Sequence, residues 1–191
     1  MDYDDKLEAV MEYFETKKSG EEKYNGVIVE VTLDDVELHT GEMTKREVVH
    51  HSGGVAVLPL DEEGNVYCVR QFRYPFGTML LEIPAGKLES GEDPLEGAKR
   101  ELSEETGFTA EEWTGLGESY ASPGYCTEVL HLYLARGLKP HPAHPDAGEY
   151  LNVEKYSLSR LTELCMNGEI RDGKTLVAVL KTARLLEAHN G

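Results

Sequence analysis

The sequence predicts an α/β protein, mostly strand, with a mixed β-sheet, three helices and an N-terminal antiparallel β-hairpin region. Runs rich in β-branched residues fill most of the first half of the chain. The continuous apolar run GGVAVLPL is typical of a strand buried on both faces. Three later segments have helical spacing with start and stop signals. At 191 residues, with 40% apolar and 29% charged residues, the chain is long enough to bury a core and too apolar to be disordered.

The N-terminal region is expected to be a helix followed by a hairpin. Residues 1–23 are charged and show a weak helical pattern. From Tyr24 onward, GVIVEVTLDDVEL and MTKREVVHH are interpreted as two strands joined by the turn HTGE. The alternation of Val27, Val29 and Val31 predicts one apolar face that needs a partner surface.

The remaining elements follow in order along the chain. GGVAVLPL and NVYCVRQFRY are predicted strands around the turn DEEGN, and WTGLGESY and VLHLYLA are later strand candidates. Three prolines between residues 136 and 148 predict a loop. SRLTELCMNG and KTLVAVLKTARLLEAH are predicted helices, the first ended by Gly168 and the second begun by Asp172.

The central helix has the clearest signals. Asp93 is expected to cap it, Pro94 to take its first position and Glu96 to reach back toward the cap. Gly107 provides the left-handed residue that ends it. An apolar face then packs on the sheet, formed by Leu95, Ala98 and Leu102.

Composition excludes several classes of function. A net charge of −17 disfavours binding to nucleic acid or to an anionic membrane, and a polyanionic substrate would need placed arginines or metal ions. The three cysteines are far apart and show no disulfide or zinc spacing. Without a long apolar run or a signal peptide, a cytoplasmic location is expected.

The central helix crowds three carboxylates, Glu101, Glu104 and Glu105, beside Arg100. At about 5–6 Å and an effective dielectric constant near 20, each like-charge pair costs on the order of 3 kcal/mol. On a solvated face the cost falls to a few tenths, so an acidic surface helix is the alternative interpretation. In a cleft, a cation would be needed to offset the repulsion between the carboxylates.

Residues 86–108 fit the pattern G-x5-E-x7-R-E-U-x-E-E-x-G-U without a departure, where U is a bulky apolar residue. This stretch resembles the Nudix box, which implies the Nudix fold, a mixed β-sheet sandwiched between helices, and metal-dependent diphosphate hydrolysis. The resemblance implies that Glu101 and Glu105 are the principal ligands of Mg²⁺ or Mn²⁺, with Glu104 close by and the carbonyl of Ala85 completing the site. It implies that Arg100 orients a neighbouring glutamate.

The flanks resemble the ADP-ribose pyrophosphatase subgroup over roughly residues 24–186. REVVHHSGGVAVLPL, VRQFRYP and LLEIPAGK precede the box, and SPGYCTE and DGKTLVAVL follow it. The resemblance implies hydrolysis of ADP-ribose to AMP and ribose 5-phosphate. There are two alternatives. The substrate could be another nucleoside diphosphate sugar, or the chain could be a non-catalytic domain that binds a nucleotide metabolite for regulation.

The same resemblance suggests substrate-binding residues. Arg46 and Arg73 match positions that contact the diphosphate or the dimer neighbour, with salt bridging to Glu47 or Glu82 as the alternative. Gly86, at the start of the box, is also placed among the substrate-binding residues. The ribose side is assigned to Glu82, Ser122 and Glu128, although Ser122 could equally form a turn.

The catalytic base is expected in the loop PDAGEYLNV. Glu149 matches a metal ligand or base of the subgroup, Ala147 stands where some relatives have their base, and Asp146 is the reserve. The resemblance also implies a homodimer through an N-terminal region, residues 1–49, followed by a hydrolase domain, residues 50–191. The alternative is that the hairpin folds back on its own sheet.

Overall fold

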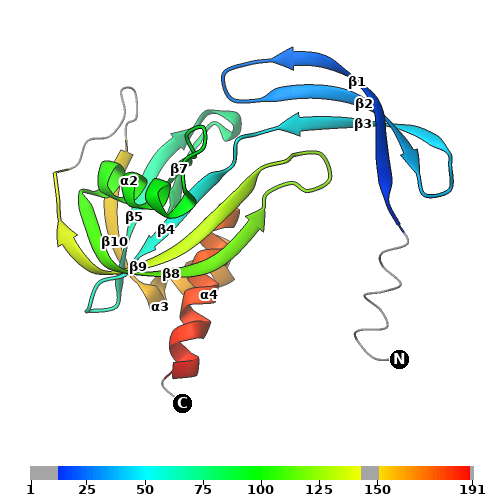
Figure 1. Ribbon diagram of the computed structural model, residues 1–191. Coiled ribbons are helices and arrows are strands. Elements are labelled where there is room, and N and C mark those ends of the chain that lie inside the picture. Colours follow the sequence, from blue (N-terminus) through cyan, green and yellow to red (C-terminus); the bar gives the residue numbers. More distant parts are fainter. Residues whose placement is uncertain (1–12, 143–150, 190–191) are drawn as a thin grey trace, which may run out of the picture. The chain divides into compact units, whose positions relative to one another are not determined.

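A computed structural model describes residues 13–142 and 151–189 of the chain (Figure 1). The chain divides into two compact units, each described by itself. The first contains the described residues up to Ser52 together with Ser122–Glu128, and the second contains Gly53–Ala121 and the described residues from Val129 onward.

The first unit is a three-stranded antiparallel sheet in the order β1-β2-β3. Its strands are Glu15–Asn25, Glu30–Leu38 and Met43–His50. The hairpin of β2 and β3 was predicted, and its turn lies where HTGE stands in the sequence. The loop Ser122–Glu128 joins this unit through a parallel bridge between Val49 and Cys126.

Two expectations for this unit are wrong. The helix expected over residues 1–23 is replaced, from Glu15 onward, by strand β1, and the rest of that segment lies outside the described residues except for Tyr13 and Phe14. All of β1 is exposed, so pairing with β2 and not an apolar face holds it in place. The expected apolar face of Val27, Val29 and Val31 also fails, because Val27 lies in the bend between β1 and β2 and is 98% exposed.

The second unit has two sheets and the three predicted helices. A mixed four-stranded sheet has the order β7-β4-β9-β8, with β4 parallel to β9 and the other pairs antiparallel. An antiparallel sheet has the order β10-β5-β6. The strands are β4 (Gly54–Pro59), β5 (Asn65–Arg73), β6 (Thr78–Glu82), β7 (Ala85–Lys87), β8 (Phe108–Tyr120), β9 (Val129–Pro140) and β10 (Leu151–Ser157).

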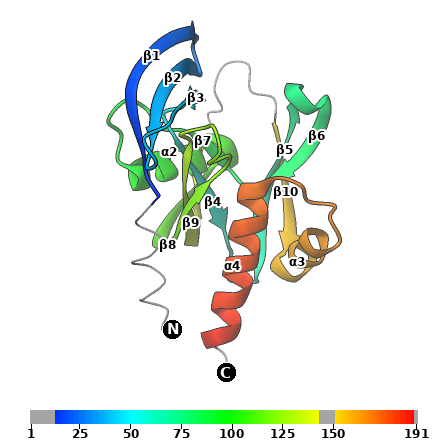
Figure 2. The same ribbon diagram turned by 90° about the vertical axis from the view of Figure 1, so that its right-hand side faces the viewer.

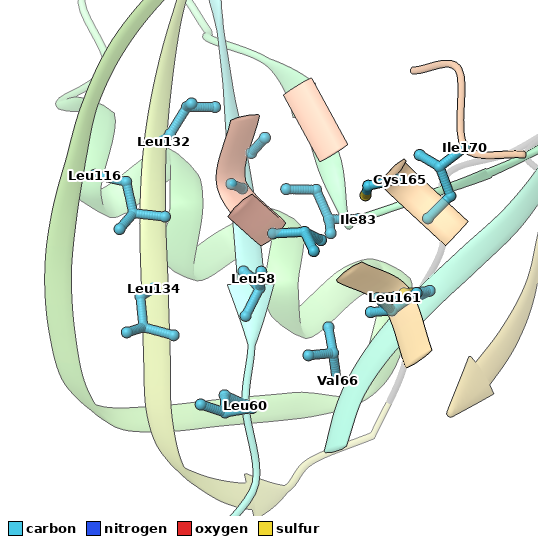
Figure 3. Close-up of a cluster of buried hydrophobic side chains, with 14 of the residues drawn as sticks. Leu58, Leu60, Val66, Ile83, Leu116, Leu132, Leu134, Leu161, Cys165 and Ile170 are labelled. Carbon is cyan, nitrogen blue, oxygen red and sulfur yellow. The ribbon is translucent and has the colours of Figure 1, made fainter. Parts of the chain in front are cut away.

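Helices cover both faces of the mixed sheet. α2 (Pro94–Thr106) packs on one face, and α4 (Gly173–His189), with α3 (Leu158–Met166) beside it, lies on the other (Figure 2). β4 runs between them, which explains its continuous apolar sequence: Val55 and Val57 pack with Ala98 and Leu102 of α2. Its alternate residues join a larger core with β5, β9, α3 and α4 (Figure 3), including Leu58, Leu60, Val66, Leu132, Leu161 and Cys165.

The helix boundaries follow the predicted signals. The Asp93 carboxylate accepts hydrogen bonds from the backbone N–H groups of Leu95 and Glu96, at 2.9 and 3.2 Å. Gly107 ends α2 with φ of 69°. Glu96 does not show the expected reach back to the cap in this structure; its carboxylate pairs with Lys99 one turn later, at 2.7 Å.

The later part of the chain differs in two respects. The predicted loop over residues 136–148 begins later, because β9 continues to Pro140 and pairs there with Phe108 at the start of β8. Strands β6, β7 and β10 were not identified by residue pattern. β7 has only three residues, too few to show a period.

No helix among the described residues is long and apolar enough to cross a membrane.

Candidate active site

The box residues form a strand, a loop and a helix. β7 provides Ala85 and Gly86, and α2 provides the glutamates. A side chain at position 86 would overlap the carboxylate of Glu101, so only glycine lets that carboxylate lie against the backbone of β7. Gly97 has a similar role, because a Cβ there would lie 2.9 Å from Leu88 and 3.1 Å from Glu92. Gly86 allows the helix to meet the preceding strand closely, and Gly97 allows it to meet the loop that contains Leu88 and Glu92.

Arg100 holds three glutamates at once. Its Nε and Nη2 donate to both oxygens of Glu92, at 2.9 and 3.0 Å. Its Nη1 donates to Glu101 at 2.7 Å and to Glu104 at 3.0 Å, and Nη2 also donates to the carbonyl of Lys87 at 3.1 Å. Hydrogen bonds to Glu92 first, and then to Glu101, raise the pKa of the guanidinium above its usual value. The orienting role of Arg100 stays a prediction, and these hydrogen bonds are the contacts through which it would act.

Glu101 and Glu105 are the inward pair of the cluster. Their exposed fractions are 8% and 3%, although both are acidic. Glu105 Oε2 accepts the backbone N–H of Ala85 at 3.0 Å, and the Glu101 carboxylate lies against Gly86. Two nearly buried carboxylates therefore converge on the same short strand, where their repulsion is costly unless cations offset it. Arg100 offsets part of it through Glu101 and Glu104.

The donor set suits a hard divalent cation. Two carboxylates meet at the backbone of residues 85–86, and carboxylate and carbonyl oxygens are the ligands that Mg²⁺ prefers. The Glu101 carboxylate occupies the space that a Cβ at position 86 would fill. Within residues 13–142 and 151–189, no three acidic, histidine or cysteine side chains already converge as a metal site. A further predicted carboxylate ligand, Glu149, lies outside the described residues, as do Asp146 and Ala147.

A second charged cluster surrounds Glu82, at the end of β6. Glu82 is 1% exposed, and Arg73 donates to both of its oxygens, at 2.7 and 2.6 Å. Lys174, at the start of α4, donates to Oε2 of Glu82 and to Asp172. Burial alone would raise the pKa of Glu82, but the hydrogen bonds from Arg73 and the charge of Lys174 hold it below its usual value. Arg73 thus forms the salt bridge foreseen as its alternative, and the contact of Glu82 with ribose stays a prediction.

The other predicted substrate residues belong to the first unit. Arg46 donates to both oxygens of Glu15, at 2.9 and 2.5 Å, so its salt-bridge partner is neither Glu47 nor Glu82. Ser122 begins a turn, its carbonyl accepting from Tyr125 and Cys126 at 3.1 and 2.9 Å. Glu128 lies 3.6 Å from Nδ1 of His51.

Sequence reasoning missed Lys174 and Asp172 as neighbours of Arg73. The stretch DGKT was noticed only as part of a family resemblance, and its helix start was attributed to Asp172 alone. The Asp172 carboxylate does cap α4, accepting from the N–H of Thr175 at 3.0 Å and from its hydroxyl at 2.6 Å. A signal was present in the sequence, a lysine two residues after the capping Asp172, but its partner Glu82 is 92 residues away.

Comparison with known proteins identifies the fold and the family. The model of the NUDIX domain matches residues 50–177. The chain is 41% identical over 161 residues to a methanol dehydrogenase activator of Bacillus methanolicus, and 40% identical over 161 residues to an ADP-ribose pyrophosphatase of Bacillus subtilis. Each alignment covers 83% of this chain and 87% of the relative.

A crystal structure titled as an ADP compounds hydrolase has the same fold, with a TM-score of 0.80 over 92% of this chain and 95% of that one, at 22% identity. These similarities agree with the intact box and with the arrangement of its glutamates around β7. The chain belongs to the NUDIX family.

Proposed function

We propose that the protein is a metal-dependent hydrolase that splits ADP-ribose into AMP and ribose 5-phosphate. The observation that carries the proposal is the convergence of Glu101 and Glu105, both nearly buried, on the Ala85–Gly86 backbone. A relative of 40% identity is named an ADP-ribose pyrophosphatase, which supports the choice of substrate.

In this proposal each residue has a definite task. Glu101 and Glu105, with the Ala85 carbonyl and Glu104 nearby, hold Mg²⁺ or Mn²⁺. A bound divalent ion supplies Lewis-acid polarisation of the phosphoryl oxygens and a lowered pKa of bound water. Arg100 fixes Glu101 and Glu104 through the hydrogen bonds described above. Arg73 offers its guanidinium to the diphosphate, and Glu149, with Asp146 in reserve, accepts the proton of the attacking water.

The reaction balances with water alone. Oxygen from water bonds to one phosphorus, the bond from that phosphorus to the bridging oxygen breaks, and the two phosphomonoesters leave. A substrate panel with Mg²⁺ tests the proposal. ADP-ribose should be among the best substrates, with dinucleoside polyphosphates and nucleoside triphosphates poorer. A hexose-linked nucleoside diphosphate preferred by about tenfold in kcat/KM (about 1.4 kcal/mol) would replace ADP-ribose in the proposal.

A regulatory role is the second candidate, because the relative of 41% identity is named a methanol dehydrogenase activator. All four acidic positions of the box are glutamate in this chain, which favours catalysis. The same panel separates the two: binding of ADP-ribose without release of phosphomonoester in the presence of Mg²⁺ would favour a regulator.

We further propose a homodimer in which the first unit packs against a second copy. The unit is a small three-stranded sheet whose β1 is exposed throughout, and its Tyr24 and Ile28 are each 58% exposed. A symmetric dimer is also the commonest closed assembly. Light scattering at micromolar concentration should give twice the chain mass of 21.3 kDa. The mass of one chain, with full activity on dilution, would contradict the dimer and favour a hairpin that folds back on its own chain.

A further inference from the structure

Arg73 and Lys174 reach the same buried carboxylate from different parts of the chain. Arg73 ends β5, Glu82 ends the paired strand β6, and Lys174 stands in the first turn of α4. The start of α4 is fixed against β6 because the hydroxyl of Thr175, which is fully buried, accepts the backbone N–H of Ile83 at 2.9 Å. The neighbouring Thr175 therefore helps to hold Lys174 beside Glu82 through a contact that does not involve the charge of the lysine.

The two cations differ in their access to solvent. The Lys174 side chain is 10% exposed and lies between Glu82 and Asp172, so both of its visible contacts are with carboxylates of the protein. The Arg73 side chain is 37% exposed, and its Nη1 makes no hydrogen bond to any residue in the ranges 13–142 and 151–189. An ammonium group has three donors, so Lys174 keeps one beyond its two contacts, but its side chain is nearly buried and Arg73 is the more exposed of the two for a ligand.

Arg73 also lies near the box. Hydrogen bonds with Glu82 raise the pKa of its guanidinium most, and the charges of Glu82, Asp172 and Glu105 add to the effect. Glu105 belongs to the inward pair of α2, so Arg73 lies within electrostatic range of a candidate metal ligand. A diphosphate held there would meet a fork of guanidinium donors.

We propose that Lys174 is a positioning residue for diphosphate binding: it neutralises Glu82 so that Arg73, held in place by that carboxylate, keeps its charge and its free edge for the substrate. This deepens the proposed function and rests on it. Without Lys174, Arg73 would be the only cation bonded to a nearly buried carboxylate. The guanidinium charge would then be balanced by Glu82 alone, and Asp172 would lose its lysine partner, so an incoming phosphate would meet one more uncompensated negative charge.

Lys174→Met tests this, with Lys181→Met as the matched control. Lys181 lies on the same helix, and its ammonium group donates to a backbone carbonyl, that of Leu116, at 2.5 Å. Calorimetry without metal measures the Kd of ADP-ribose and of inorganic pyrophosphate, and steady-state kinetics with Mg²⁺ gives KM and kcat. Lys174→Met should weaken both ligands about tenfold and raise KM similarly, with kcat within about threefold of wild type. Lys174→Arg should restore affinity to within about threefold, and Lys181→Met should leave it unchanged.

Each result decides the proposal. Unchanged affinity in Lys174→Met, equal losses in the two methionine variants, or a fall in kcat with Kd unchanged would overturn it. If Lys174→Met does not fold, Lys174→Gln, which keeps a donor and removes the charge, takes its place with the same expected weakening. A wild-type protein that binds pyrophosphate and not ADP-ribose would end the proposed function, while the pyrophosphate data would still decide the role of Lys174. Binding of neither would end both.

Discussion

The two charged clusters of the second unit both contain carboxylates, but their net charges differ. In the box, one guanidinium bonds Glu92, Glu101 and Glu104, and Glu105 adds a fourth negative charge. At the end of β6, Arg73 forms a salt bridge with Glu82, and Lys174 forms salt bridges with Glu82 and Asp172. Four carboxylates against one cation leave the first cluster with a charge of −3, whereas two against two leave the second neutral. The excess negative charge of the first cluster suits a metal ion, whereas the neutral second cluster has no such excess and leaves the partly exposed Arg73 for the phosphate of the proposed function.

Among the predicted changes, loss of an inward glutamate should have the largest effect on activity. Glu105→Gln removes one negative charge but keeps an oxygen to accept the Ala85 N–H. Turnover of ADP-ribose should fall by about a hundredfold or more, because a main stabiliser of charge at the reacting centre is lost. Thermal unfolding should change little. Glu96→Gln, on the exposed side of the same helix, is the control, and near-wild-type turnover in Glu105→Gln would remove this residue from the site.

Arg100→Lys sharpens the comparison by keeping the charge and losing the fork of donors. An ammonium group cannot hold Glu92 by two bonds while also bonding Glu101 and Glu104. Metal affinity, read from the Mg²⁺ dependence of the rate, should fall about tenfold, as for other groups that orient metal ligands. The control is Arg184→Lys, an exposed pair with Glu187 on α4. Equal Mg²⁺ dependence in the two variants would show that charge alone is sufficient.

Gly86→Ala tests the close approach of β7 to the box helix. The new Cβ would overlap the Glu101 carboxylate and force it away from the backbone. We expect a loss of about 1–3 kcal/mol in the free energy of unfolding. The Mg²⁺ concentration needed for the half-maximal rate should also rise. Gly115→Ala is the control, since a Cβ there meets nothing within 4 Å. Wild-type stability and turnover in Gly86→Ala would mean that Glu101 does not need this cradle.

The box could be predicted from sequence, whereas in the Glu82 cluster only the pairing of Arg73 with Glu82 was foreseen, and the reason is physical. Arg100, Glu101, Glu104 and Glu105 lie within two turns of one helix, so helical spacing alone brings them together. Arg73 and Glu82 share a hairpin, but Lys174 meets them only through the packing of α4. Strand β1 was mistaken for a helix because its polar sequence, ETKKSGEEKYN, carries no strand period, and only its pairing with β2 makes it a strand.

A third ion pair gives the smallest expected effect and a baseline for the other two. Arg70 of β5 donates to both oxygens of Glu154 of β10, at 2.5 and 3.1 Å, in a one-to-one pair that the proposed chemistry does not use. Glu154→Gln should lower the free energy of unfolding by about 0.5–1 kcal/mol and leave kcat unchanged.

This pair also has a defined pH dependence. Hydrogen bonds from Arg70, and then from Tyr156, lower the pKa of Glu154 from its ordinary value of 4.5. A lowered pKa in the folded state contributes stability above the unfolded value and loses it as the pH falls through the folded one. Urea unfolding should therefore show wild type and Glu154→Gln converging below about pH 4. A difference that persists there would assign the effect to packing.

The most direct test of the contrast between the two clusters is a Mn²⁺ titration followed by electron paramagnetic resonance, which reports free Mn²⁺, on wild type, Glu105→Gln and Arg73→Gln without substrate. The charge difference predicts that Glu105→Gln binds Mn²⁺ at least about tenfold more weakly than wild type. Arg73→Gln, altered only in the neutral cluster, should bind Mn²⁺ as wild type does. Equal Mn²⁺ affinity in wild type and Glu105→Gln would contradict the assignment of the metal to the box glutamates.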